Sequence, residues 1–398
     1  MVLYSPGQTS SYPEEVVKEG LRFHYLGGGN EVGNVGCILE DATGTRLLLD
    51  YGLAPTDPPR YPKEAPKVTD CIITHSHIDH IGMAPWLASN HSTRLHGTAL
   101  TGEIARPMWN DCYKVSQIEG YPLSWDKRDI DEAVELWQGH GFDEKITFHN
   151  WKWRLLPAGH IPGAAMVNIE TPTHRILFTG DFDTRDSELV NGAKPVECDI
   201  LFVEGTYGGR NHPPKKLEQQ RFIDRVSEVV ARGGTCLVPA FANGRTQDVL
   251  MLLHKSGLNL NTHIDGMGKF LAKLYLEHPD YLRSSDELEL ALAWAKKVSS
   301  KSDRKKALDA DVIITTSGML DGGPSIWYMN RLRDNPKNAI LLTGYQASGS
   351  GGRKLLEEGR LVIYGTEVAI DLEVDQFAFS THSGHDEIIT FAQQCHAK

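Results

Sequence analysis

The sequence has no apolar run close to the roughly 20 residues that span a bilayer, and residues 1–6 have neither the basic nor the apolar region of a signal peptide. These absences predict a cytoplasmic protein with no membrane partner. The six cysteines are scattered without a Cys-x-x-Cys pair, which argues against a disulfide framework or a thiolate zinc site. Several lie in apolar runs and are expected to be buried small hydrophobic residues.

Basic residues are also fewer than acidic ones: the chain has 41 Lys and Arg and 52 Asp and Glu, which gives a net charge of −11. Such a chain does not attract polyanions broadly, so contact with a nucleic acid has to come from local basic clusters and bound metals. The densest basic cluster, residues 296–306, is expected to be mainly a solvated helical face. With 398 residues, 40% of them apolar, the chain is expected to be globular and to have roughly two domains.

The most informative stretch that is present runs from Thr74 to His80. It places three imidazoles and a carboxylate directly after the apolar residues Cys71, Ile72 and Ile73, which are typical of a buried strand. Imidazole nitrogens and carboxylate oxygens are the donors that borderline divalent ions prefer, and their alternation along a turn lets neighbouring ligands serve two ions. The motif therefore predicts a dinuclear site, with zinc the favoured metal, rather than a histidine-rich surface loop.

Three more apolar runs end in candidate ligands or ligand supports. The run 153–156 leads to His160, the run 176–178 leads to Asp181, and the run 47–49 leads to Asp50. Two metal ions that share a water turn it into a hydroxide nucleophile near neutral pH and neutralise charge on the group it attacks. The residues therefore predict hydrolysis, with a phosphodiester or an acyl bond as the target.

Together these residues resemble the metallo-β-lactamase superfamily. The resemblance implies an αββα sandwich of two sheets flanked by helices, with the metals at one edge. It implies that Asp50 orients a ligand histidine from behind. It assigns His75, His77 and His160 to one ion and Asp79 and His80 to the second, with Asp181 bridging the two.

The rest of the chain has three parts with different patterns. Residues 27–33 form a glycine-rich hairpin turn that lacks the pattern of a phosphate-binding loop. A helical pattern follows from about 100 to 149. After Glu204, strand and helix signals alternate, with helical material from about 269 to 307, which predicts an inserted α/β domain with a largely parallel sheet. The predicted domains are 1–208 for the first part of the sandwich, 209–377 for the insert, and 378–398 for the return to the sandwich.

Four further motifs make the resemblance narrower. They are Val-Glu-Gly-Thr-Tyr-Gly at 203–208, Pro-Ala-Phe-Ala-Asn-Gly-Arg-Thr-Gln at 239–247, Thr-Ser-Gly-Met-Leu-Asp-Gly-Gly-Pro at 316–324 and Thr-Gly-Tyr-Gln at 343–346. They look like the signatures of the β-CASP branch of nucleases, and most resemble the archaeal cleavage and polyadenylation specificity factor type without KH domains. This resemblance implies a single-stranded RNA substrate and, as a further partner, a second copy or a processing complex.

The branch also implies roles for individual residues outside the metal set. Glu204 matches its acidic motif, and Phe-Ser-Thr-His at 379–382 matches its Phe-Ser-x-His motif. A carboxylate that orients an imidazole lets His382 protonate the departing sugar oxygen, so Asp79, Glu204 and His382 are the predicted catalytic residues. Ser317, Arg353 and Lys354 are weaker candidates for contact with a backbone phosphate.

One feature departs from the family pattern. The family carries another histidine about two dozen residues beyond the Phe-Ser-x-His motif, where it completes the second metal's ligands, whereas this sequence ends at Lys398. Three interpretations follow. The sequence is a shortened chain, His385 or His396 substitutes, or water fills the position. We favour the first, which predicts a weaker second site.

The function predicted from the sequence is a zinc-dependent ribonuclease, with manganese as the alternative metal, that acts in mRNA 3′-end processing or RNA decay through a metal-bridging hydroxide. Three alternatives stay open. They are a 5′ to 3′ exoribonuclease of the RNase J type, a thioester or lactone hydrolase, and an inactive RNA-binding scaffold. Retention of every ligand within the chain argues against the scaffold, and the insert argues against the small-ester hydrolase.

Overall fold

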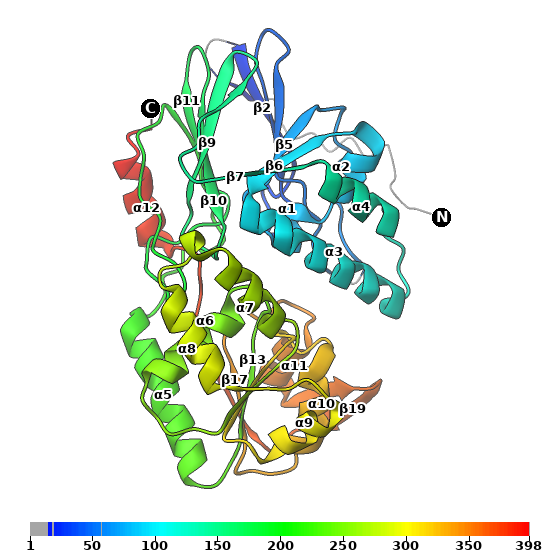
Figure 1. Cartoon of the computed structure of the whole chain (residues 1–398), viewed down its shortest axis with the longest axis vertical. Coiled ribbons are helices and arrows are strands. Elements are labelled where there is room, and N and C mark those ends of the chain that lie inside the picture. The colour runs from blue at the N-terminus through cyan, green and yellow to red at the C-terminus, as the bar shows by residue number, and fades with distance from the viewer. Residues whose placement is uncertain (1–14, 18–19, 57, 398) are drawn as a thin grey trace. The chain divides into compact units, whose positions relative to one another are not determined.

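The computed structural model describes residues 15–17, 20–56 and 58–397. The described chain forms two compact units (Figure 1). The first comprises residues up to 185 together with 192–208 and 385–398, and the second comprises 186–191 and 209–384. The predicted insert, 209–377, therefore lies within the second unit. No helix in the described part of the chain is both long and apolar enough to cross a membrane.

The first sheet of the first unit has seven strands in chain order, antiparallel from β1 to β4 and parallel from β4 to β7. Leu47, Leu48 and Leu49 of its fourth strand are all buried, as expected for a strand that is covered on both faces. The strands are β1 (Glu15–Val17), β2 (Leu21–Gly27), β3 (Gly36–Glu40), β4 (Arg46–Leu49), β5 (Asp70–Ile72), β6 (Arg94–Thr98) and β7 (Trp137–His140).

The second sheet has five strands in the order β12-β11-β10-β9-β8, and only the β11–β12 pair is parallel. In β9, buried Trp151 and Trp153 alternate with exposed Lys152, which is the period of two that directs every second side chain inward. The strands are β8 (Ile146–Phe148), β9 (Trp151–Pro157), β10 (Ala165–Glu170), β11 (Arg175–Phe178) and β12 (Ile200–Phe202).

The two sheets pack face to face over a core that includes Leu47 and Leu49 from the first sheet and Trp151 and Trp153 from the second. Helices cover their outer faces. The helices over the first sheet are α1 (Ile78–Ile81), α2 (Ala84–His91), α3 (Ala99–Glu119) and α4 (Lys127–Glu135), and α12 (His385–Gln394) packs on the second sheet. The first unit is thus the αββα sandwich that the sequence predicted.

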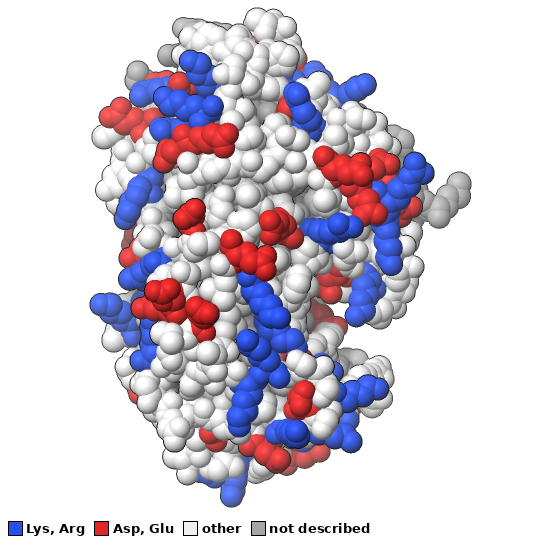
Figure 2. Space-filling model, viewed as in Figure 1, with Lys and Arg blue, Asp and Glu red and all other residues white. Residues whose placement is uncertain are grey.

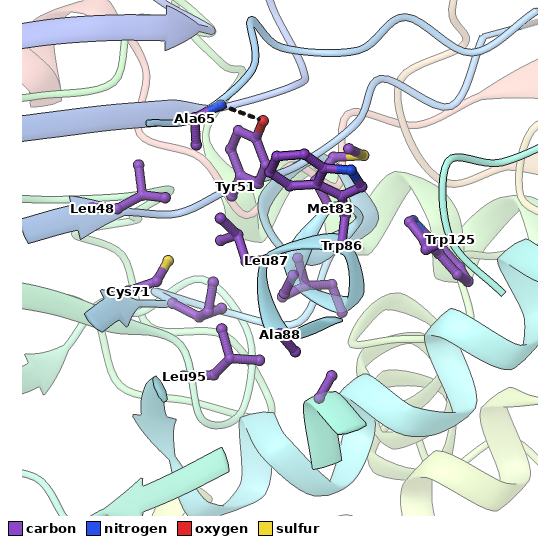
Figure 3. Close-up of a cluster of buried hydrophobic side chains, with 14 of the residues drawn as sticks. Leu48, Tyr51, Ala65, Cys71, Met83, Trp86, Leu87, Ala88, Leu95 and Trp125 are labelled. Carbon is purple, nitrogen blue, oxygen red and sulfur yellow. Dashed lines mark hydrogen bonds between the residues drawn. The ribbon is translucent and has the colours of Figure 1, made fainter. Parts of the chain in front are cut away.

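The core between the first sheet and its helices has large side chains on the helix side (Figure 3). Trp86 of α2 lies beside Tyr51, and Leu87 of α2 belongs to the same cluster as Leu48 of β4 and Cys71 of β5. The hydroxyl of Tyr51 accepts a hydrogen bond from the amide of Ala65 at 3.0 Å, so this polar atom of the core has a partner. This core supports the edge of the sheet from which the motif 74–80 emerges.

The second unit is built on a parallel sheet in the order β15-β14-β16-β13-β17-β20. Its central strands are fully buried, because helices cover both faces of such sheets. The strands are β13 (Cys236–Pro239), β14 (Thr262–Asp265), β15 (Lys296–Lys297), β16 (Val312–Thr315), β17 (Ala339–Leu342) and β20 (Glu373–Gln376), and β18 (Arg360–Ile363) pairs only with β19 (Thr366–Ala369).

The helices of the second unit follow its strands. They are α5 (Lys215–Ala231), α6 (Arg245–Lys255), α7 (Gly268–Glu277), α8 (Ser285–Trp294), α9 (Lys301–Lys306), α10 (Gly323–Leu332) and α11 (Gly351–Glu358), with short 3-10 turns at Pro279–Tyr281 and Ala307–Asp309. The α/β class and the largely parallel sheet of the insert agree with the prediction.

Two stretches that the sequence predicted as helical contain strands. In 100–149 the chain leaves the helices to form β7 and β8, and in 269–307 it forms β15. Gln138 and Gly139 in β7 are exposed and carry no apolar alternation, so the pairing with β6 rather than the local pattern makes this strand. Likewise Lys296 and Lys297 in β15 extend only because they pair with β14.

Candidate metal centre

The candidate ligands of the first unit follow the ends of strands. His75 and His77 lie in the turn between β5 and α1, and Asp79 and His80 lie in α1 itself. Because β4 and β5 are parallel neighbours, their carboxyl ends lie at one edge of the sheet. The others come from three more strand ends: Asp50 follows β4, His160 follows β9 and Asp181 follows β11.

One group of donors consists of three imidazoles and a carboxylate. The Nδ1 atom of His77 lies 3.1 Å from Nε2 of His75 and 3.1 Å from Nε2 of His160. Oδ2 of Asp181 lies 3.6 Å from the His75 nitrogen and 3.8 Å from the His160 nitrogen. One donor atom from each of these four residues lies within 4.8 Å of the others, so the structure brings together ligands separated by up to about a hundred residues of chain.

A second group shares Asp181 with the first. Nε2 of His80 lies 3.4 Å from Oδ2 of Asp181 and 3.9 Å from Oδ2 of Asp79. His80 is buried, whereas Asp79 is partly exposed. The carboxylate of Asp181 thus lies between both groups, which is the position that a bridging ligand requires.

The charge state of the two groups fits divalent cations. Burial and the nearby His80 hold the pKa of His75 well below its usual value, although Asp181 acts in the opposite direction, so the imidazole is neutral and its lone pair is available. Burial also lowers the pKa of His80, but the carboxylates of Asp181, Asp50 and Asp79 outweigh it and hold that pKa well above its usual value. The second group therefore attracts positive charge. Neutral imidazoles and carboxylates together form a donor set suited to zinc or a similar ion.

Behind the ligands lies Asp50, which has no exposed surface. Its Oδ2 accepts a hydrogen bond from Nδ1 of His80 at 2.8 Å, and its Oδ1 accepts one from the amide of Thr74 at 2.7 Å. The hydroxyl of Thr74 donates to the same Oδ2 at 2.8 Å. A carboxylate behind a ligand histidine fixes its tautomer and ring orientation. Thr74 begins the ligand motif, but its residue type alone did not predict this contact.

Glu204 lies just beyond β12 in the first unit. Its Oε1 accepts the amide of Phe182 at 2.9 Å, and its own amide donates to the hydroxyl of Thr179 at 3.2 Å. Both partners are within two residues of Asp181. The carboxylate thus supports the turn that carries the shared ligand.

The remaining predicted site residues belong to the second unit. The His382 amide donates to the Ser380 hydroxyl at 3.1 Å, and its carbonyl accepts from His212 at 3.0 Å. The amide of Ser317 donates to the hydroxyl of Ser325 at 3.2 Å. All three contacts lie within the second unit and fix the backbone around His382 and Ser317.

Arg353 and Lys354 lie in the first turn of α11. The guanidinium of Arg353 donates to the carbonyl of Gln346 at 2.9 Å, and Lys354 is paired with Glu367. Among the described residues, neither His385 nor His396 belongs to a cluster of metal-ligating side chains. His385 begins α12 and His396 follows the end of that helix, so neither is a replacement ligand in this structure.

Comparison with known proteins gives two family matches. The Metallo-beta-lactamase superfamily matches residues 30–226, and the Beta-Casp domain matches residues 246–355. The chain is 34% identical to a probable RNase MJ4 of Methanocaldococcus jannaschii over 92% of this chain and 88% of that protein. It is 34% identical to RNase aCSPSF2 of Saccharolobus solfataricus over 92% of this chain and 75% of that protein. An RNase J-like protein of Methanocaldococcus jannaschii is 29% identical over 94% of this chain and 89% of that protein.

Proposed function

Since this chain belongs to the metallo-β-lactamase superfamily and carries a β-CASP domain, we propose that it is a metal-dependent ribonuclease that hydrolyses RNA phosphodiester bonds. The observation that supports this most directly is the pair of donor groups that share Asp181. Two relatives named as RNases, each 34% identical over 92% of this chain, favour RNA over a thioester or lactone as the substrate.

We assign one ion to the four-residue group and a second ion to the three-residue group described above. Zinc is the proposed metal and manganese the alternative, because imidazole nitrogens and carboxylate oxygens suit both. When bound, two such ions activate a water near neutral pH and neutralise charge on the attacked phosphate. The assigned ligands are His75, His77, His160 and Asp181 for the first ion and Asp79, His80 and Asp181 for the second.

The chain's own groups have separate proposed tasks. Asp181 keeps the two donor groups together, and Asp50 holds His80 in the orientation that directs Nε2 toward them. Glu204 holds the backbone next to Asp181 through the amide of Phe182. His382 is the proposed proton donor to the departing sugar oxygen, because imidazole titrates near the pH at which such transfer is efficient.

The proposed phosphate contacts come from loops of the second unit. Ser317 follows β16, and Arg353 and Lys354 begin α11 after β17. Arginine and lysine side chains are common donors to a phosphate backbone, which supports a contact with RNA there. In this structure Arg353 donates to the Gln346 carbonyl and Lys354 pairs with Glu367, so RNA would replace these partners.

The motifs between 203 and 346 favour a role in mRNA 3′-end processing or RNA decay. The relative named RNase J-like protein keeps a 5′ to 3′ exoribonuclease as the second candidate, because metal ligands do not distinguish cleavage inside a chain from cleavage at its end. A homodimer or a processing complex stays a prediction.

The test uses a single-stranded RNA with a 5′ monophosphate and a label at its 5′ end, incubated with zinc or manganese and resolved on a denaturing gel. Asp181→Ala protein is the control. Internal fragments that the control does not produce support an endonuclease, whereas immediate release of the labelled mononucleotide supports the exonuclease.

Two further assays distinguish the other classes. Turnover of a thioester or lactone with no RNA cleavage would assign the small-ester hydrolase instead. If the wild-type protein binds RNA but neither cleaves RNA nor retains metal, the protein is the inactive RNA-binding scaffold.

A further inference from the structure

The hydroxyl of Thr74 lies among the groups that support both metal positions. The residue is 1% exposed, so water does not compete for its hydrogen bonds. Its Oγ1 atom lies 2.8 Å from Oδ2 of Asp50, 3.1 Å from Nδ1 of His75 and 3.4 Å from Nδ1 of His80. These three neighbours are separated in the chain by up to 30 residues.

Only one arrangement of protons satisfies these contacts. An ionised carboxylate accepts and never donates, so the Thr74 hydroxyl gives its single proton to Asp50. Nδ1–H of His80 donates to the same carboxylate oxygen at 2.8 Å. The contact between Thr74 and His75 must then have the ring as donor, because the hydroxyl proton is already used. Both histidines therefore carry a proton on Nδ1, which leaves Nε2 as the ring nitrogen that can bind an ion.

The same side chain also packs against the turn that carries the shared carboxylate. Gly180 directly precedes Asp181 and has a positive φ of 51°. A Cβ atom placed on Gly180 would lie 2.7 Å from the Cβ of Thr74, so the two residues are in tight contact. The Thr74 carbonyl accepts a hydrogen bond from the amide of Ala165 at 2.9 Å, which anchors the residue to the second sheet.

We propose that Thr74 is a positioning residue that couples the two metal positions. The coupling runs from His75 through the Thr74 hydroxyl and the Asp50 carboxylate to His80. The inference rests on the proposed two-ion centre. Because His75 is assigned to one ion and His80 to the other, loss of one hydroxyl weakens both positions. By contrast, replacing a single residue that binds one ion directly acts first on that ion.

The experiment compares Thr74→Val with Thr74→Ser and with a matched control. Thr93→Val is the control, because Thr93 is also buried and its hydroxyl donates to the Val68 carbonyl at 2.8 Å, away from the ligands. Each protein is loaded with zinc and dialysed against a competing chelator, and bound zinc is measured by mass spectrometry. We expect Thr74→Val to bind both ions about tenfold more weakly, since outer-shell partners typically contribute that much. Thr74→Ser and Thr93→Val are expected to match the wild type.

A second readout needs no metal. Nitrogen-15 NMR of histidine in the metal-free protein reports which ring nitrogen carries the proton. We expect His75 to carry it on Nδ1 in the wild type and in Thr74→Ser, and to lose this preference in Thr74→Val.

The outcomes separate this inference from the proposed function. Wild type that holds two zinc ions, with Thr74→Val equal to Thr93→Val, overturns the coupling and leaves the ribonuclease standing. Weaker binding in Thr74→Ser together with wild-type binding in Thr74→Val also overturns it, because the methyl contact with Gly180 rather than the hydroxyl would then be responsible. Wild type that retains neither zinc nor manganese after loading overturns both the metal centre and the coupling.

Discussion

Asp181 is the residue on which the proposed centre depends most, because its carboxylate is the only donor common to both groups in the described part of the chain. We expect Asp181→Ala to lower the rate of RNA cleavage by about a thousandfold or more, since such ions contribute several kcal/mol of charge stabilisation. Bound metal should also fall. Asp199→Ala removes a carboxylate that pairs with Arg175 elsewhere in the same unit and is the control. Full activity in Asp181→Ala would refute the mechanism.

His382 belongs to a different functional class from the metal ligands, because its proposed task is proton transfer. We expect His382→Ala to lower the cleavage rate by about 10² to 10⁴ while the amount of bound metal stays at the wild-type level. His174→Ala, at a hairpin turn of the second sheet, controls for the loss of an imidazole. A loss of metal equal to that in Asp181→Ala would remove the general-acid assignment and leave the metal centre intact.

At the scale of elements, β5 and β6 are joined by a buried carboxylate beyond their backbone pairing. Oδ1 of Asp70 accepts from Nε2 of His96 at 2.8 Å and from Nε of Arg94 at 2.9 Å. Burial alone would raise the pKa of Asp70, but the hydrogen bonds from His96 and Arg94 outweigh it and hold that pKa well below its usual range. The ionised carboxylate therefore stabilises the fold at neutral pH.

This pair gives a prediction for pH dependence. The contribution of a carboxyl with a lowered pKa is fully present above its unfolded value near 3.9, and is lost as the pH falls through the lower native value. We expect Asp70→Asn to lower the free energy of unfolding by about 2 kcal/mol at pH 7 and by much less at pH 2. Urea unfolding at both pH values measures this.

The control for Asp70 is Glu40→Gln, which alters the more exposed pair between Glu40 and Arg46 across β3 and β4. It should cost less than about 1 kcal/mol. An equal loss for Asp70→Asn at both pH values would contradict the electrostatic account.

Helix α12, near the end of the described chain, packs against the loop that carries Asp181. Phe391 is 1% exposed, and its ring centroid lies 4.7 Å from that of Phe182, the residue that follows Asp181. We expect Phe391→Ala to cost about 4 kcal/mol of stability and to weaken metal binding. The control Ile389→Ala, on the exposed face of the same helix, should change stability by less than about 0.5 kcal/mol. Equal effects of the two substitutions would exclude a supporting role for this helix face.

At the scale of the whole molecule, a net charge of −11 has to be reconciled with a polyanionic substrate. Figure 2 shows a band of Lys and Arg side chains on the face of the second unit that is in view. The densest basic segment of the sequence, residues 296–306, forms β15 and α9 in that unit, and Lys301, Lys305 and Lys306 are exposed there. Local charge of this kind can bind a phosphate backbone although the chain as a whole is acidic.

Salt dependence measures how many of these charges contact RNA. Each phosphate contact contributes about 0.7 to the slope of log affinity against log salt for a single strand. If the three lysines contact RNA, their replacement by alanine in Asp181→Ala protein should lower the slope by about 2. Alanines at Lys67, Lys145 and Lys152, which are exposed in the first unit, provide the control. An unchanged slope would show that the lysines of residues 296–306 form a solvated face and do not contact RNA.

Much of this protein is determined by sequence alone. The α/β class, the family and the order of the ligand-bearing strands follow from apolar runs that end in His75, His160 or Asp181. These features depend on short-range periodicity and on residue chemistry, which are both present in the one-dimensional pattern. The helical pattern after about residue 100 similarly predicted α3 and α4, and the capping side chain of Asp126 sets the start of α4 at Lys127.

Other features were decided only by the tertiary structure. β7 and β15 are strands because a neighbour offers backbone hydrogen bonds, not because their own residues favour extension. The hydrogen bonds from His80 and Thr74 to Asp50 exist because the ends of β4 and β5 meet, which brings residues 30 and 24 positions apart into contact. Sequence patterns report which face of an element is buried, whereas proton positions and ligand orientation depend on atoms that only packing brings within 3 Å.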